Sequence, residues 1–256
     1  MHAESGAPVA LKFFTKMEDY RRETALRARP GLDPRFVPGL LEAEESPEGL
    51  PPFVVTERGD FSLAELAARA PPPPAQQRII LHDLAAALAH LHALGVVAMA
   101  VEPGSLMFFG AAGAWKLVDW ERWAAPGAPA DIRYALRYAA PEVVAADLMG
   151  EPSVAAAPAL DAWPLGVIAF EVLAGRRFYG GASDQEAMQA LLGHGALPSE
   201  GRDSVLGDVA DPDAQRMLRH LIRRIPAARW PAARVAGCAY FAKAGDFELL
   251  RVRPTE

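Results

Sequence analysis

Residues 161–174 read DAWPLGVIAFEVLA, a stretch that is apolar on nearly every side of a helix. A helix that is apolar all round is buried in the core of a protein. Asp161 is placed to cap the first turn, and Pro164 then falls within that turn, where proline is tolerated. We therefore expect one central helix, around which this part of the chain packs.

Further helices are indicated on both sides of this segment. Residues 75–94 carry a stripe of apolar side chains typical of a packed helix, and Gly95 ends it. The capping-box pattern at 183–186 opens a second helix, and Asp211-Pro212 starts a third. The second half of the chain is therefore predicted to be mostly helical, apart from a small hairpin at residues 106–118.

The first third of the chain differs, because it alternates short β-like runs with one helix. Thr15 and Glu18 form a capping box that opens a helix running to about Arg27. Strands are expected at residues 9–14, 36–45 and 53–56. A small β-rich part followed by a larger helical part is an α+β arrangement with two lobes.

The bulk composition excludes several classes of function. The chain has 256 residues, 51% of them hydrophobic, with a net charge of −6 and no basic run, so no nucleic-acid partner is expected. The apolar stretch 163–173 is far shorter than a membrane span needs. The single cysteine, Cys238, allows no internal disulfide, which fits an intracellular, cytoplasmic setting.

Several short motifs stand in an order and at spacings that resemble those of protein kinases, over most of the chain. They are Val9-Ala10-Leu11-Lys12, Glu23 on the next helix, the run 91–97, Lys116-Leu117-Val118-Asp119-Trp120-Glu121, Ala140-Pro141-Glu142, the helix start 161–167, and Arg229. The resemblance implies a single two-lobed kinase-like domain, with residues 1–56 as the small lobe, 57–61 as the hinge and 62–256 as the large lobe. It also implies an ion pair between Glu142 and Arg229, and a structural role for Asp161.

The segment at the position of the catalytic loop departs from the family pattern. Kinases read H-R-D-L-K-P-x-N there, whereas residues 98–105 read AMAVEPGS. Ala100 stands where the family has its base aspartate, Ser105 where it has a metal-binding asparagine, and Glu102 where it has a lysine. The degenerate positions are Ala98, Met99, Ala100, Glu102 and Ser105.

These replacements act directly on phosphoryl transfer. A general base typically contributes about 10²–10⁴-fold in rate, and a carboxylate at Glu102 opposes the developing negative charge. The resemblance therefore implies a catalytically inactive pseudokinase, a scaffold or allosteric module that binds a protein partner. The alternative left open is an atypical Ser/Thr-type kinase or nucleotide-binding phosphotransferase with weak activity.

The resemblance also implies a vestigial nucleotide site, for which no cofactor is required but ATP with magnesium stays open. Its positions are Lys12, Glu23, Ala10, Thr56 as gatekeeper, Met107 and Asp119. The Lys12–Glu23 pair either positions a nucleotide or is a strut between sheet and helix. Asp119 is either a magnesium ligand or a turn residue bonded to backbone amides. Glu121, in place of the family's flexible glycine, favours one fixed conformation.

The N-terminal lobe is expected to be short. Only eight residues precede Val9, and no G-x-G-x-x-G motif occurs, so the first two strands and their phosphate loop do not fit. Either they are missing or they lie upstream in a longer chain. Elsewhere we favour structural interpretations over functional ones. Pro71–Pro74 is interpreted as a stiff loop rather than a polyproline docking site, and Tyr134 and Tyr138 as packed side chains rather than phosphorylation sites. His82, His90 and His92 are interpreted as structural or surface residues rather than a metal site.

Overall fold

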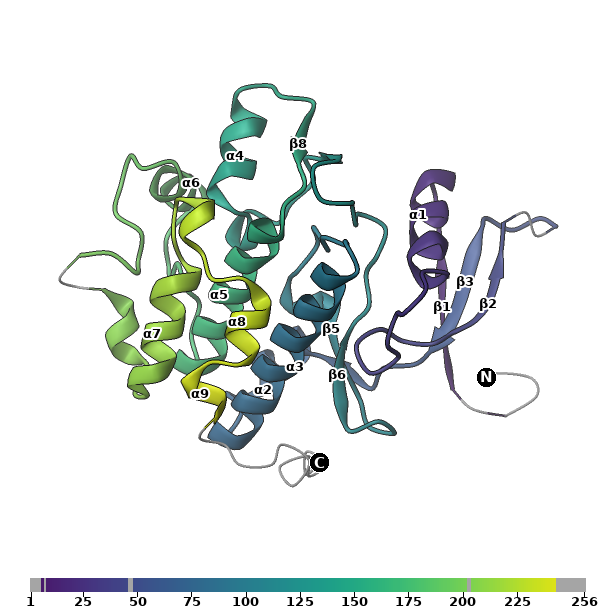
Figure 1. The fold of residues 1–256 in the computed structure, drawn as a ribbon, viewed down its shortest axis with the longest axis horizontal. Helices are drawn as coiled ribbons and strands as arrows, with labels where there is room; N and C mark the ends of the chain where they lie inside the picture. Colours follow the sequence, from purple (N-terminus) through teal and green to yellow (C-terminus); the bar gives the residue numbers. More distant parts are fainter. Residues whose placement is uncertain (1–5, 7, 46–47, 202–203, 243–256) are drawn as a thin grey trace.

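The N-terminal part of the protein is a three-stranded antiparallel sheet with one helix against it (Figure 1). The structure is a computed structural model that describes residues 6, 8–45, 48–201 and 204–242. Across the sheet the strands run in the order β1 (Val9–Phe13), β3 (Phe53–Glu57) and β2 (Leu40–Glu44), and the helix is α1 (Met17–Arg27). The central strand β3 is the most buried of the three, as expected for a strand paired on both sides.

Strand β2 is shorter than expected. The prediction that it begins at Phe36 was wrong, because the strand begins at Leu40. Pro38 has no N–H to donate to a ladder, and the Gly39 N–H donates instead to the Glu57 carboxylate over 2.7 Å. The backbone before residue 40 is therefore held by a side chain as well as by single backbone hydrogen bonds, from Leu117 to the Phe36 carbonyl and from Glu57 to the Gly39 carbonyl, and not by a continuous ladder.

A second small sheet lies between the first one and the helices (Figure 1). Its antiparallel strands are β4 (Phe61–Ser62), β5 (Leu106–Phe109) and β6 (Ala114–Leu117). β5 and β6 form the predicted hairpin, in whose turn Gly113 has a φ of 59°, a conformation that favours glycine. A third, two-stranded ribbon pairs β7 (Pro129–Asp131) with β8 (Ser153–Ala155).

The rest of the chain is mainly helical. Its α-helices are α2 (Leu63–Arg69), α3 (Pro74–Ala93), α4 (Pro141–Leu148), α5 (Pro158–Ala174), α6 (Asp184–Leu191), α7 (Pro212–Leu221), α8 (Ala232–Ala236) and α9 (Ala239–Ala242). Short 3₁₀ turns are η1 (Pro103–Ser105), η2 (Leu136–Tyr138), η3 (Val205–Asp208) and η4 (Pro226–Ala228). Within the described part of the chain, none of the helices has both the length and the apolar character needed to cross a membrane.

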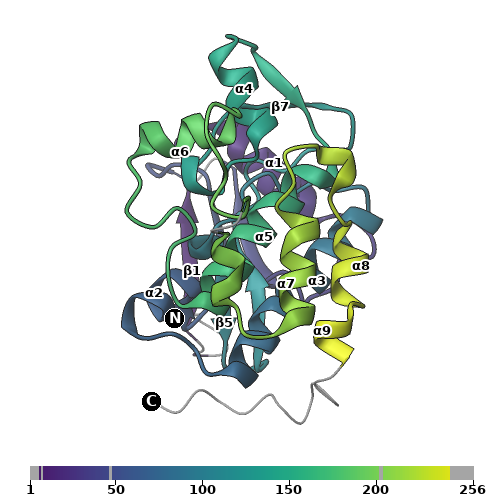
Figure 2. The same cartoon turned by 90° about the vertical axis from the view of Figure 1, so that its left-hand side faces the viewer.

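Helix α5 is the centre of the helical part, as predicted. Every residue from 160 to 170 is buried, and α3 and α7 pack against it (Figure 2). Gly166 permits the contact with α7, since a Cβ there would lie 2.8 Å from the Leu221 Cβ and 2.9 Å from Ile222 Cγ1. The fold is therefore α+β, with a small sheet-rich part and a large helical part.

Two expectations about the start of α5 were wrong. The helix begins at Pro158, whose ring suits the first helical position, so Asp161 lies inside it and is not its cap. Pro164 consequently lies in the interior of the helix rather than in its first turn. The Asp161 carboxylate is used elsewhere, since it accepts hydrogen bonds from a separate loop, described below.

The predicted caps had mixed outcomes. Ser183 forms the expected capping box with Glu186, and Asp211 caps α7 through the N–H groups of the second and third helical residues. The capping box at Thr15 was wrong, because α1 begins after Lys16 without any side-chain cap. Glu18 pairs instead with Arg22, one turn later, over 2.6 Å. The first turn of α1 thus carries an i,i+4 ion pair and no side-chain cap.

Candidate functional site

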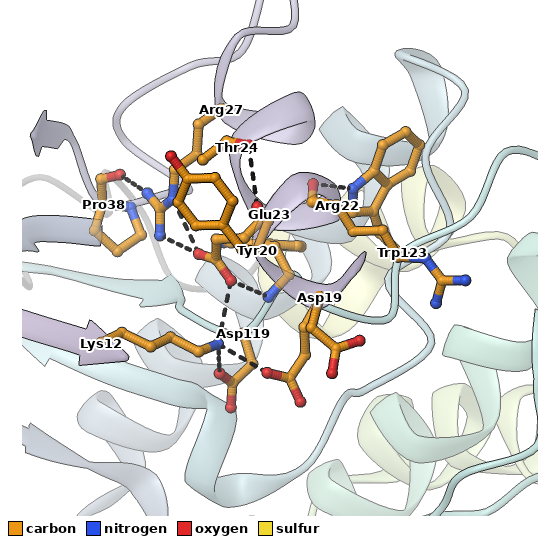
Figure 3. A network of polar contacts seen from close by, with 12 residues as sticks. Lys12, Asp19, Tyr20, Arg22, Glu23, Thr24, Arg27, Pro38, Asp119 and Trp123 are labelled. Carbon is orange, nitrogen blue, oxygen red and sulfur yellow. Dashed lines mark hydrogen bonds and ion pairs between the residues drawn. The ribbon is translucent and has the colours of Figure 1, made fainter. Parts of the chain in front are cut away.

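Lys12 on β1 lies at the centre of a charged cluster that joins three parts of the chain (Figure 3). Its Nζ donates to Glu23 Oε2 on α1 over 3.1 Å and to Asp119 Oδ1 over 2.8 Å. Glu121 Oε2 lies 3.3 Å from the same nitrogen. Sequence reasoning placed Lys12, Glu23 and Asp119 together, and the structure brings them into contact.

Glu23 is fully buried and has a second cationic partner. Its Oε1 accepts hydrogen bonds from both Nε and Nη2 of Arg27, at 3.0 and 2.7 Å, one helical turn away. Its Oε2 also accepts from the backbone N–H of Trp120 over 3.2 Å. A buried carboxylate needs such partners, because losing its hydration is costly. Glu23 therefore joins β1, α1 and the segment that follows Asp119.

The charges around Lys12 keep its ammonium protonated. Burial lowers the pKa of Lys12, but the nearby carboxylates of Glu23, Asp119 and Glu121 outweigh burial and raise the pKa above its ordinary value. Three carboxylates face two cations here, Lys12 and Arg27, so the cluster carries one negative charge in excess.

Further contacts attach α1 to the segment after Asp119. The Trp123 Nε1–H donates to the Arg22 carbonyl over 2.7 Å, as Figure 3 shows. The Arg22 guanidinium pairs with Asp131 over 3.0 Å, and Arg133 pairs with Asp19 over 3.2 Å. Because these contacts lie along one side of α1, they hold the helix against residues 120–133.

A cavity of about 480 Å³ opens between the two sheets next to Lys12. This volume is within the range of about 300–1,000 Å³ found for small-molecule sites. Its apolar lining comes from both sheets and includes Ala10, Val54, Met107, Phe109 and Val118, with Thr56 beside them. The cavity thus contains every nucleotide-site position that the sequence predicted.

A half-buried ion pair lies beside this cavity, whose lining includes Glu57. Lys116 Nζ donates to Glu57 Oε1 over 2.6 Å, and the Thr56 hydroxyl donates to the Glu57 carbonyl. Gly59 allows the chain to pass close to Met107, which lines the cavity, since a Cβ on residue 59 would lie 2.9 Å from the Met107 Cε. Residues 57–59 are therefore packed directly against the apolar lining.

The loop 98–105 is held by the central helix. Asp161 Oδ2 accepts from the N–H of Ala98 over 2.7 Å, and Asp161 Oδ1 accepts from the N–H of Met99 over 2.9 Å. His92 Nε2 lies 2.8 Å from Asp161 Oδ2. Met99 has a φ of 64°, a left-handed conformation that costs a non-glycine residue roughly 1–2 kcal/mol. The loop thus keeps a strained backbone, and Asp161 supplies the hydrogen bonds that hold it.

The side chains of this loop offer little to a phosphoryl group. Ala100 is apolar and buried. The buried Ser105 hydroxyl donates to the Glu102 carbonyl over 2.9 Å and accepts from the Glu102 N–H over 3.0 Å. Ser105 therefore uses its hydroxyl to close a turn of its own loop, and Glu102 is the only ionisable side chain among these three.

The polar groups at the Lys12 end of the cavity are already engaged with other groups. Asp119 Oδ1 is bonded to Lys12, and the Ser105 hydroxyl is bonded to its own loop. Among the described residues, no group of three or more His, Cys, Asp or Glu side chains is arranged to hold a metal ion. The apolar end of the cavity suits a flat aromatic ring.

Glu142 and Arg229 form the predicted ion pair. Arg229 Nη1 and Nη2 donate to Glu142 Oε1 and Oε2 over 2.6 and 2.7 Å, a two-pronged arrangement. The Arg229 side chain is fully buried and also donates to the carbonyls of Arg223 and Ala159. The pair ties the start of α4 to the end of α7 and the start of α5.

Both tyrosines after β7 make structural contacts. The Tyr134 hydroxyl donates to Asp147 over 2.6 Å, and burial together with this carboxylate raises the pKa of Tyr134 to about 12. The Tyr138 hydroxyl donates to Glu171 over 2.9 Å. These contacts favour the structural interpretation of the two side chains, as the His92–Asp161 contact does for His92.

Sequence reasoning missed several residues of the cluster. Arg27 could have been found, because it stands four residues after Glu23 on the same face of a predicted helix. Glu121, Trp123 and Asp131 carry no local signal for their roles, since their partners lie about a hundred residues away along the chain.

Residues 1–241 match a family model described as protein kinase domain. The search of curated proteins gave no match.

Proposed function

Since the chain belongs to the protein kinase family, we propose that it is a catalytically inactive member, a pseudokinase that acts as a scaffold or allosteric module by binding a protein partner. The proposal places the small lobe at residues 1–56, the hinge at 57–61 and the large lobe at 62–256. It takes an intracellular setting as its context.

The observation that carries this proposal is the loop 98–105. Phosphoryl transfer in this family uses an aspartate that accepts the proton of the substrate hydroxyl, an asparagine that holds a metal, and cationic groups near the phosphoryl. Here those positions hold Ala100, Ser105 and Glu102, and the Ser105 hydroxyl is committed to its own loop. The start of the loop is nevertheless held by two backbone hydrogen bonds to Asp161, which supports a retained structural role.

The contacts of α1 support a binding role in a second way. A module that binds through its surface needs a stable shape, and α1 is held to residues 120–133 by ion pairs and by Trp123. No phosphorylated side chain is needed to hold α1 in this position, because Asp19 and Asp131 supply the anionic partners of Arg133 and Arg22. The proposed partner is a protein, which this fixed surface would recognise.

The test is a transfer assay with labelled ATP, Mg²⁺ or Mn²⁺, and generic protein acceptors. We expect turnover below that of active kinases, about 1–100 s⁻¹, by more than 10²-fold. The native chain is compared with Ala100→Asp, with Asp119→Ala and with Asp208→Ala, a control on an exposed ion pair far from the loop in sequence. Clear turnover by the native chain that is lost only in Asp119→Ala would overturn the proposal.

The alternative is an atypical kinase or phosphotransferase with weak activity. It is favoured by one observation, the intact contact of Lys12 with Glu23 and Asp119. If Ala100→Asp alone restored turnover, the phosphate and metal sites would be competent and the alternative would gain support. We expect no such rescue, because groups that act as one catalytic unit are not repaired singly.

A further inference from the structure

Glu121 does not line the cavity itself, but its carboxylate lies 3.3 Å from the Nζ of Lys12, which does. We propose that Glu121 is a specificity-determining residue that competes with phosphate for Lys12, so that the cavity takes an uncharged, nucleoside-like ligand in preference to a nucleoside triphosphate. This inference rests on the assignment of the cavity as the ligand site of a kinase domain, and it names the class of ligand.

Lys12 has little spare capacity to donate hydrogen bonds. An ammonium group has three N–H donors. Glu23 and Asp119 accept hydrogen bonds from two of them, and Glu121 Oε2 lies 3.3 Å from the same nitrogen. A phosphate group that approaches Lys12 would have to compete with these carboxylates.

Of the three carboxylates, Glu121 is the one that decides whether a phosphate group can reach Lys12. Glu23 is fully buried and is also held by Arg27 and by the Trp120 N–H, so it stays in place. Asp119 has a direct hydrogen bond to Lys12. Glu121 is about one-third exposed and makes the longest contact, yet it brings the third negative charge to a cluster that two cations would otherwise balance.

The two ends of the cavity differ in polarity and charge. The end between the sheets is apolar, lined by Val54, Met107, Phe109 and Val118, and suits a planar ring. The polar end carries an excess of negative charge around Lys12, where an incoming triphosphate would meet like charges. A ligand that has a planar ring and no phosphate groups would pack against the apolar end and would bring no negative charge to the polar end.

The test is isothermal titration calorimetry of the full chain with adenosine, with ATP and Mg²⁺, and with ATP and a chelator. We expect the native chain to bind adenosine at least as tightly as ATP. In Glu121→Gln, we expect ATP to bind about tenfold more tightly than in the native chain, a difference of about 1.4 kcal/mol, and adenosine to bind equally in both. The control is Glu45→Gln, an exposed partner of Arg21 outside the cavity lining.

A double variant shows whether the gain passes through Lys12. In Lys12→Met combined with Glu121→Gln, the tenfold gain for ATP should disappear, whereas Glu23 keeps its contact with Arg27. Glu121→Ala serves as a second variant if the glutamine side chain still blocks the lysine. Melting curves confirm that each variant is folded.

Two results would overturn the inference. One is a native chain that binds ATP at least tenfold more tightly than adenosine; the other is a Glu121→Gln variant whose affinity for ATP is unchanged. Binding of neither ligand by any variant also counts against it. None of these results bears on phosphoryl transfer, which the assay with labelled ATP measures separately.

Discussion

At the scale of single residues, buried arginines connect distant parts of this chain. The Arg27 and Arg229 side chains are almost completely removed from solvent, and each meets a carboxylate through two nitrogen atoms. A buried ion pair need not add much stability over an apolar pair, but removal of one partner leaves a charge without compensation. The consequence of a substitution therefore depends on whether the remaining charge can reach water.

The Glu142–Arg229 pair gives a direct prediction. Glu142→Ala should lower the free energy of unfolding by about 3–5 kcal/mol, because the Arg229 guanidinium stays buried without its carboxylate. The matched control is Glu200→Ala, whose partner Arg224 is 30% exposed and where the loss should be about 1 kcal/mol or less. Urea denaturation followed by tryptophan fluorescence measures both values. Equal losses in the two variants would show that burial does not set the cost.

At the scale of secondary-structure elements, α1 and residues 120–133 behave as one unit. The helix itself has little apolar character, and only Tyr20, Glu23 and Leu26 are buried in it. Besides the apolar contacts of Tyr20 and Leu26, it is positioned by polar contacts, which include the bond from Trp123 to the Arg22 carbonyl and the Glu23–Lys12 pair. An element held in this way depends on its polar partners as well as on its few core contacts.

Removing the tryptophan contact should therefore loosen the helix. In Trp123→Ala we expect faster hydrogen exchange of the α1 amides, although the substituted residue lies about a hundred positions away in the sequence. Exchange measured by mass spectrometry on peptides that cover residues 17–27 and 119–133 tests this. Glu18→Gln, which removes only an exposed ion pair of the same helix, is the control. Acceleration confined to residues 119–133 would contradict the coupling.

At the scale of the whole molecule, one apolar core extends from the N-terminal part to the last helix. It includes Leu26 of α1, Val37 before β2 and Phe241 of α9, together with the whole centre of α5. Helix α5 contacts both α3 and α7, so its position determines how the large part of the molecule assembles (Figure 2). A small change in its surface should affect the stability of the entire domain.

Gly166 is the position at which to test this. Gly166→Ala places a Cβ within 3 Å of side-chain atoms of Leu221 and Ile222, so α5 and α7 must separate. We expect the free energy of unfolding to fall by about 1–3 kcal/mol, as for other overpacked cores. Gly207→Ala is the control, because a Cβ there meets nothing within 4 Å. A melting temperature as high in Gly166→Ala as in the control would show that the two helices have room to adjust.

Much of the fold could be predicted from local patterns in the sequence. The apolar segment that contains Trp163 and Leu165 identified the central helix, and the caps at Ser183 and Asp211 located the starts of two others. These signals lie within a few residues of the structure that they specify, because capping and helical periodicity are local interactions. The order of elements followed from them.

Only the tertiary structure decided which side chains meet. Asp161 reads as a helix cap, but its carboxylate binds amides 62 and 63 positions earlier in the chain. Glu121 reads as a replaced glycine, but it contacts Lys12 on the first strand. Each carboxylate could satisfy several partners with similar local geometry, and its choice depends on which segments the core packing brings together. The sequence by itself therefore determined the main helices, the β-rich start of the chain and their order, whereas the partners of the charged groups depend on the packing of the whole chain.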